Sequence, residues 1–162
     1  YPTAVYTVPL GVILPKDVDN LLLPVPVSGS HIGFSTLRME PCWMALGQAA
    51  GITAALAIDK GVKVRNVDIP SLQDILIKQK ATLIYFRDVK PTDDAFPLVQ
   101  YLGLRGYLPD WNASLQQPID ESTLRNWSNL CGTQLKATPG QTTRLKVLTD
   151  IYKLQSERTG LF

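Results

Sequence analysis

The chain has 162 residues, of which 45% are hydrophobic and 19% charged, and its formal net charge is +2. That length suits about one ordinary domain, and the apolar content supports a packed core rather than disorder. The 16 basic and 14 acidic residues are mixed along the chain. We therefore expect a soluble protein with no basic face for nucleic acid. Two cysteines cannot form a disulfide framework, and no residues have metal-ligand spacing, so no metal is expected.

The first part of the chain has the composition of short strands. Residues 5–14 are rich in β-branched and aromatic side chains, and a second apolar run, 20–27, is bounded by Pro24 and Pro26. Residues 28–40 contain Gly and hydroxyl side chains, which predicts a loop. Residues 81–86 are typical of a strand or an extended linker. These runs predict a mixed α/β fragment with a few short strands.

A small-residue helix is predicted after this loop. Pro41 suits its first turn, and Lys60 with Gly61 forms an end signal, so the helix is expected to run to about Asp59. It is uncharged from Cys42 to Ile58, and a helix that is apolar all round is typical of burial on every side. Its interior glycines each cost up to about 1 kcal/mol relative to Ala. They indicate close approach of another backbone or of a flat ligand, and tight packing on a sheet explains them equally well.

The same helix contains the longest apolar stretch of the chain. That stretch is interrupted by Gly47, Gln48 and Gly51 and is shorter than the roughly 20 residues of a comfortable bilayer span. We therefore expect no membrane span.

The rest of the chain has helical periodicity. A helix is predicted over 70–80, and the polar segment 88–94 contains Pro91 and indicates a boundary. We therefore predict two domains, 1–87 and 88–162. The second is expected to be a helical tail with core-facing aromatic side chains, and its helices are predicted over residues 95–104, 120–131 and 142–156.

No catalytic set is evident from residue types alone. The chain has one histidine, His31, and it lacks both the glycine-rich dinucleotide motif and the phosphate-binding loop motif. The most informative feature is the polar loop containing Ser28 and Ser30, which leads into the small-residue helix. Free N–H groups and the helix dipole at such a start suit an electron-rich or anionic group.

Three stretches of sequence together resemble a known family. They read VDNLLLPV (18–25), SGSHIGFSTLRMEP (28–41) and MALGQAAGITAALA (44–57). In combination they resemble the C-terminal FAD-binding region of the FAD-dependent oxidoreductases. They are most similar to the bacterial branch whose members have been labelled xanthan lyase-related. The resemblance covers roughly residues 1–80.

The resemblance implies FAD as cofactor and a division of labour in binding it. In such enzymes an N-terminal nucleotide-binding unit holds the ADP half of FAD, and the C-terminal region faces the flavin. Arg38, Met39 and Glu40 correspond to the turn that brings N–H donors near the pyrimidine edge of the flavin ring. The residues expected to bind the cofactor are Ser28, Ser30, Arg38, Met39, Glu40 and Gly47. His31 and Arg38 are the candidate catalytic residues, placed to meet a small-molecule substrate or to handle a proton.

The nucleotide-binding unit is not found within the 162 residues. We therefore expect this chain to be a C-terminal fragment that is inactive alone, does not retain FAD, and needs that unit as its partner. Without the unit, an apolar patch beside helix 41–59 is expected to remain exposed and to favour self-association.

Two other functions remain open from sequence. One is a carbohydrate-processing, xanthan lyase-like protein, for which Tyr107, Asp110 and Trp111 are the nearest candidates. The other is a non-enzymatic module whose tail binds a glycan or a protein partner.

Overall fold

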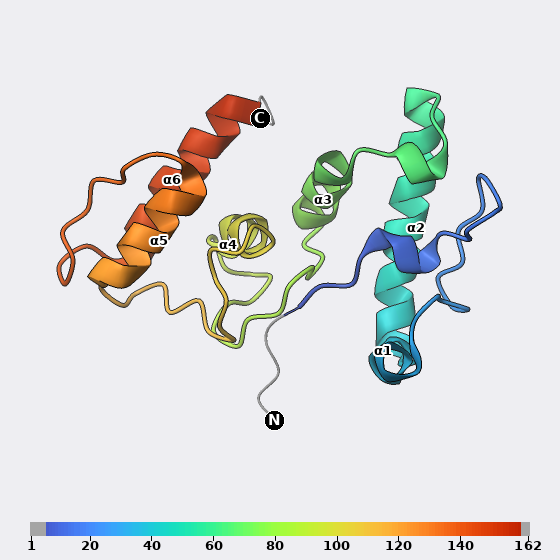
Figure 1. Cartoon of the computed structure of the whole chain (residues 1–162), viewed down its shortest axis with the longest axis horizontal. Coiled ribbons are helices and arrows are strands. Elements are labelled where there is room, and N and C mark those ends of the chain that lie inside the picture. The colour runs from blue at the N-terminus through green and yellow to red at the C-terminus, as the bar shows by residue number, and fades with distance from the viewer. Residues whose placement is uncertain (1–5, 160–162) are drawn as a thin grey trace. The chain divides into compact units, whose positions relative to one another are not determined.

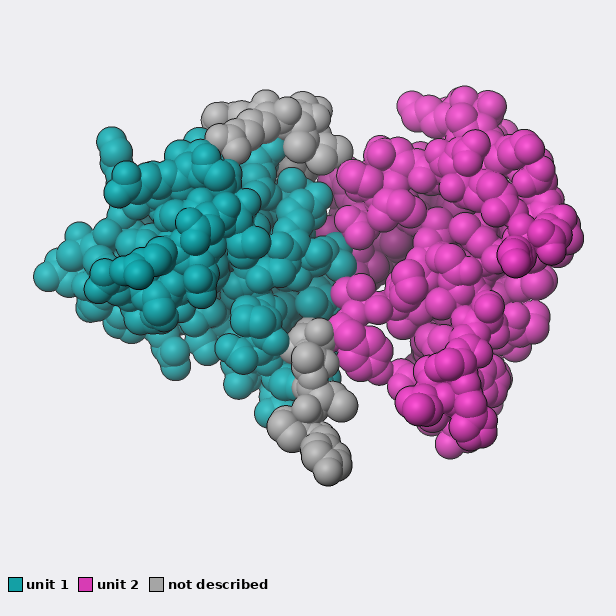
Figure 2. Space-filling view, in the orientation of Figure 1, with its two compact units in different colours: residues 1–5, 84–162 teal, residues 6–83 magenta. Residues whose placement is uncertain are grey.

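The chain forms two compact units of helices. The computed structural model describes residues 6–159. Unit 2 comprises Tyr6–Leu83, and unit 1 contains the described residues from Ile84 onward; Figure 2 shows each in its own colour. Helix accounts for 51% of the chain and strand for 1%, with no sheet among the described residues. The predicted mixed α/β class, with a few short strands, is therefore wrong.

The apolar run 20–27 lacks the pairing partner that a strand needs. The chain before it turns into a short 3-10 helix, η1 (Leu10–Ile13), and the run crosses η1. Two backbone hydrogen bonds join this part of the chain to η1. Leu23 N donates to the Ile13 carbonyl at 2.9 Å, and Ser28 N, directly after the run, donates to the Val12 carbonyl at 2.8 Å. The prolines at positions 24 and 26 have no N–H to donate, so these contacts cannot extend into a ladder. Val5, the first residue of the other predicted strand, lies outside the described residues.

The predicted loop 28–40 contains a helix, α1 (His31–Leu37). Ser30 caps it, and its Oγ accepts a hydrogen bond from Gly33 N at 3.1 Å. Leu37 is buried at its far end. Gly and β-branched residues are weak helix formers, and α1 contains Gly33 and Ile32. Propensity alone therefore favours a loop, whereas the serine cap and the burial of Leu37 favour the helix.

The long helix is present as predicted, within one residue at each end. It is α2 (Glu40–Lys60), with Pro41 in its first turn. Gly61 ends it in the left-handed region at φ 62°, where a residue without Cβ is unstrained. In Figure 1, α1 lies at the N-terminal end of α2.

α2 is buried along one face rather than on every side, as its composition had indicated. The inner face is formed by Leu46, Ala50, Thr53 and Ala57. Near its start this face packs with Ile13, Val27 and Leu37, and near its end with residues of η2 (Val64–Asn66) and α3 (Ile69–Lys78). The opposite face is exposed, and Met44 and Ile58 on it are 77% and 82% exposed.

Among the described helices, α2 alone is long and apolar enough to cross a membrane. This statement rests on the length and composition of α2 only. Of its most apolar 18-residue stretch, 22% is buried within the protein. The expectation that the chain has no membrane span stays a prediction.

Unit 1 is built from three helices that were predicted from sequence. These are α4 (Phe96–Gly103), α5 (Glu121–Cys131) and α6 (Arg144–Thr159). α4 packs with α6, where Tyr101 and Tyr152 meet edge to face with centroids 5.1 Å apart. The loop that precedes α4 is held by the buried side chain of Gln100, which accepts from Ile84 N at 3.0 Å and donates to the Ile84 carbonyl at 2.8 Å.

Replacing Gln100 by Leu is expected to lower the free energy of unfolding by about 2–4 kcal/mol. The change leaves the N–H and carbonyl of Ile84 buried without these partners, and each such group costs roughly 1–3 kcal/mol. Urea denaturation of both proteins measures the difference. The matched control is Gln141→Leu at an exposed position, which should change stability by no more than about 0.5 kcal/mol. Equal effects at both positions would show that the Gln100 hydrogen bonds contribute nothing.

Asp120 caps α5 and makes its stability sensitive to acid. Its carboxylate accepts from Thr123 N, Thr123 Oγ1 and Ser122 Oγ, and these hydrogen bonds hold the pKa of Asp120 well below its ordinary value of 3.8. The stabilisation is therefore complete above about pH 4 and is lost progressively as the pH falls from there through the lower pKa of the folded state. Asp120→Asn keeps an acceptor that does not titrate. Its melting temperature is expected to fall less steeply than that of the wild type below pH 4. The control variant Asp94→Asn should lose melting temperature below pH 4 as steeply as the wild type. The same steep loss in Asp120→Asn would contradict the assignment.

Candidate functional site

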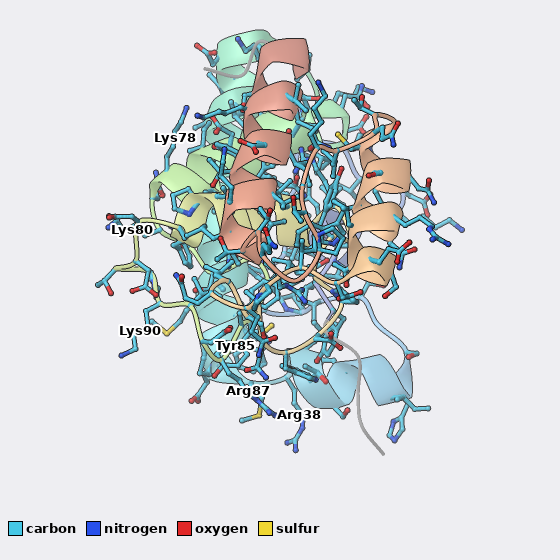
Figure 3. All side chains as sticks on the ribbon, turned by 90° about the vertical axis from the view of Figure 1, so that its left-hand side faces the viewer. Arg38, Lys78, Lys80, Tyr85, Arg87 and Lys90 are labelled. Atoms are coloured by element: carbon cyan, nitrogen blue, oxygen red, sulfur yellow. The ribbon has the colours of Figure 1, made fainter. Side chains whose placement is uncertain are left out.

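The turn between α1 and α2 brings three of the predicted cofactor-binding residues together. Arg38 is the C-cap of α1, Met39 is the N-cap of α2, and Glu40 is the first residue of α2. All three side chains are exposed, and Figure 3 shows the Arg38 side chain extending away from the ribbon.

The backbone of this turn offers hydrogen-bond donors. The Met39 carbonyl already accepts from Cys42 N at 2.9 Å and from Trp43 N at 3.2 Å. Pro41 has no N–H. The N–H groups of Met39 and Glu40 are therefore the ones at this helix start that remain to meet an external acceptor. Together with the helix dipole and the Arg38 guanidinium, they suit an electron-rich group.

The other predicted residues are spread along α1 and α2. Ser30 uses its hydroxyl as the cap of α1, and Ser28 is fixed through its backbone to Val12. His31 is exposed at the first position of α1. Since α1 has seven residues and a helix rises 1.5 Å per residue, His31 and Arg38 lie at opposite ends of a helix about 10 Å long. The two candidate catalytic residues are not brought together by this helix.

The outer face of α2 is apolar and largely exposed, and its central residues are small. We use this name for Met44, Gly47, Gly51, Ala55 and Ile58, which follow one another at helical spacing. A Cβ added to Gly47 or to Gly51 would meet nothing within 4 Å. The close approach that these glycines predicted is therefore not made by any described residue. Sequence could not show which face is uncovered, because both faces are apolar.

Near the start of α2, the Cys42 thiol is half-buried and the indole Nε1 of Trp43 is buried. Burial raises the pKa of the Cys42 thiol, which reduces its thiolate population, and Cys42 packs against the core around Ile13. The indole Nε1 of Trp43 is buried and has no hydrogen-bond partner. We assign no chemistry to either residue.

No described metal cluster marks this turn. Among residues 6–159, no group of three or more His, Cys, Asp or Glu side chains is arranged to hold a metal ion. Cavities of about 540, 410 and 190 Å³ lie elsewhere, and none is lined by Arg38, Met39 or Glu40. The side chains of Arg38, Met39 and Glu40 are exposed on the surface of unit 2.

The residues considered for carbohydrate processing do not form a sugar-binding platform. Tyr107 is 2% exposed, and its hydroxyl accepts from Gln155 Nε2 at 2.7 Å. Burial is the main cause that raises the pKa of Tyr107 to about 12. Trp111 is half-buried beneath Arg87, whose Cζ lies 5.7 Å from the ring centroid. Tyr107 is therefore a core residue and cannot stack on a sugar.

Comparison with known proteins bears on unit 2. Residues 1–76 match the family model described as FAD dependent oxidoreductase. The matched region includes α1, α2 and the turn between them. No curated protein and no solved structure matches the chain. The match supports a relation of this region to FAD-dependent oxidoreductases, a family that binds FAD.

The glycines of this region are expected to lower the stability of the chain on its own. Gly47→Ala and Gly51→Ala should each raise the free energy of unfolding by roughly 0.5–1 kcal/mol, because Ala is the better helix former and its methyl group meets no neighbour. Chemical denaturation measures both changes.

The matched control is Gly103→Ala in α4. A Cβ there would lie 3.0 Å from Phe86 Cε2 and Cζ, so this change should be destabilising. A destabilising effect at Gly51 as well would show that its helix face is covered in solution.

Proposed function

We propose that unit 2 is the flavin-facing part of an FAD-dependent oxidoreductase and that its α1–α2 turn meets the flavin ring. The family match over residues 1–76 is the observation that carries this proposal. The turn supports it because it combines a cation, two backbone donors and a helix start at an exposed position.

The residues of the turn fit the electron-rich edge of a flavin. FAD, when bound, supplies the hydride acceptor. The N–H groups of Met39 and Glu40 would donate to that edge, and the guanidinium of Arg38 would add positive charge beside it. Such fixed positive groups stabilise negative charge that develops on reduction. An arginine guanidinium is a fixed cation, so the role proposed for Arg38 is to bind an anion rather than to carry a proton. His31 is the candidate proton carrier.

The ADP half of the cofactor needs a binding unit other than this one. Among the described residues, no strand leads into a glycine-rich turn of the kind that binds a pyrophosphate. We propose that another segment supplies this unit and covers the outer face of α2. Gly47 and Gly51 would let its backbone approach closely. The chain alone would then lack most of the contacts that retain FAD.

No observation favours a carbohydrate-processing protein as a second candidate. The xanthan lyase-related label therefore adds no activity to the proposal, and the substrate is left as a small molecule.

The proposal is tested by absorbance of a longer protein that contains this chain together with its nucleotide-binding unit. Flavin bands are expected there, and none in residues 1–162 alone at equal concentration. Arg38→Leu in the longer protein should weaken FAD binding several-fold or lower the flavin potential, because it removes a charge beside the ring. Arg125→Leu, which removes an exposed cation in unit 1, is the matched control. A longer protein that is colourless and takes up no added FAD would overturn the proposal.

The proposal that another segment covers the outer face of α2 is tested separately with the variant Gly51→Leu. The isolated chain should remain folded, because the new side chain meets open space, whereas the longer protein should lose flavin. Flavin retained at the wild-type level would show that this face does not meet the nucleotide-binding unit.

A further inference from the structure

Unit 1 contains a cavity that is separate from the proposed flavin surface. It has a volume of about 410 Å³ and lies among the turn before residue 110, α5 and the start of α6. Its polar lining residues are Asp110, Thr123, Asn126, Asn129 and Arg144. The floor includes Trp127, which is fixed by a hydrogen bond from its Nε1 to the Tyr107 carbonyl at 2.8 Å.

Arg144 is the cation of this cavity. Its Cζ lies 5.3 Å from the centroid of the Trp127 ring. Its Nε is buried and has no hydrogen-bond partner, and no described acidic side chain forms an ion pair with it. A buried donor on a charged group is costly when it has no acceptor. Arg144 also lines the cavity, where an anion would give its guanidinium the charged partner that it lacks.

A comparison with Arg105 shows that stacking on a ring does not itself leave such a group unpaired. Arg105 lies over Tyr101 with its Cζ 3.5 Å from the centroid, and its Nη1 donates to the Tyr101 carbonyl at 2.9 Å. The larger cavity of about 540 Å³ offers no comparable feature, because its arginine, Arg125, pairs with Glu121 at 3.1 Å. The cavity at Arg144 is therefore the stronger candidate for a site.

We propose that this cavity binds a small anion through Arg144. A carboxylate or phosphate group pairs with the guanidinium, whose fork of N–H donors suits both. The carboxylate of Asp110 and the amide oxygens of Asn126 and Asn129 accept from hydroxyl or amine groups of the same ligand. The ligand class is thus a small hydroxylated or amino-bearing anion. This inference does not depend on the flavin proposal.

The test uses the full 162-residue chain labelled with ¹⁵N. Glucuronate, glucose and inorganic phosphate are titrated separately, while the Arg144 Nε–H and Trp127 indole signals are followed. A saturable shift of both signals with glucuronate but not with glucose would identify a carboxylate site. A saturable shift with phosphate alone would identify a phosphate site. Equal shifts with glucose and glucuronate, or no saturable shift with any probe, would overturn the proposal.

Variants separate binding from folding. Arg144→Gln should weaken binding on the order of tenfold or more, since a charge-assisted hydrogen bond is lost. Arg105→Gln removes another ring-stacked cation, one that does not line the cavity, and should leave binding unchanged. Asn126 is exposed, so Asn126→Phe should fill the cavity and abolish binding while the circular dichroism spectrum stays the same. Unchanged binding in a folded Asn126→Phe variant would overturn the proposal even where Arg144→Gln fails to fold.

Discussion

Unit 2 depends on the inner face of α2. Four residues of that face, Leu46, Ala50, Thr53 and Ala57, are buried, and η1, α1, η2 and α3 all pack with this helix. Three of the four are small, which keeps the neighbouring backbone close. Even the hydroxyl of Thr53 is satisfied within the helix, where it donates to the Ala49 carbonyl at 2.7 Å. A single helix therefore packs with all four of these short elements, and it does so with one side only.

Local signals explain what sequence could predict of this fold. α2 and the helices of unit 1 end at residues whose own chemistry stops or starts a helix, such as Gly61 in the left-handed region and the capping carboxylate of Asp120. The turn at Arg38, Met39 and Glu40 was also found from sequence, because its position follows from the start of α2. These signals act within a few residues and need no knowledge of distant contacts.

The predictions that were wrong concern elements that depend on contacts distant in the sequence. A strand requires a neighbour with matching free donors and acceptors, and residues 20–27 meet the 3-10 helix η1 instead. α1 depends on the Ser30 cap and on burial of Leu37 against residues far along the chain, which outweigh its weak intrinsic propensity. The exposed face of α2 could not be predicted from the sequence for a related reason. An even apolar composition has no periodicity, so it cannot show which side has a neighbour.

The two arginines proposed to bind anions show how far residue type alone can lead. Arg38 was identified because it lies in a family-like motif, yet its side chain is in water, where an unpaired guanidinium costs little. Arg144 has no motif, and at the start of an amphipathic helix it resembles any surface cation. Its Nε is buried, and its Cζ lies 5.3 Å from the ring centroid of Trp127, which is on a different helix. Tertiary packing thus leaves the Arg144 Nε buried without an acceptor. A buried donor without an acceptor carries this cost in any chain, whatever its family relation.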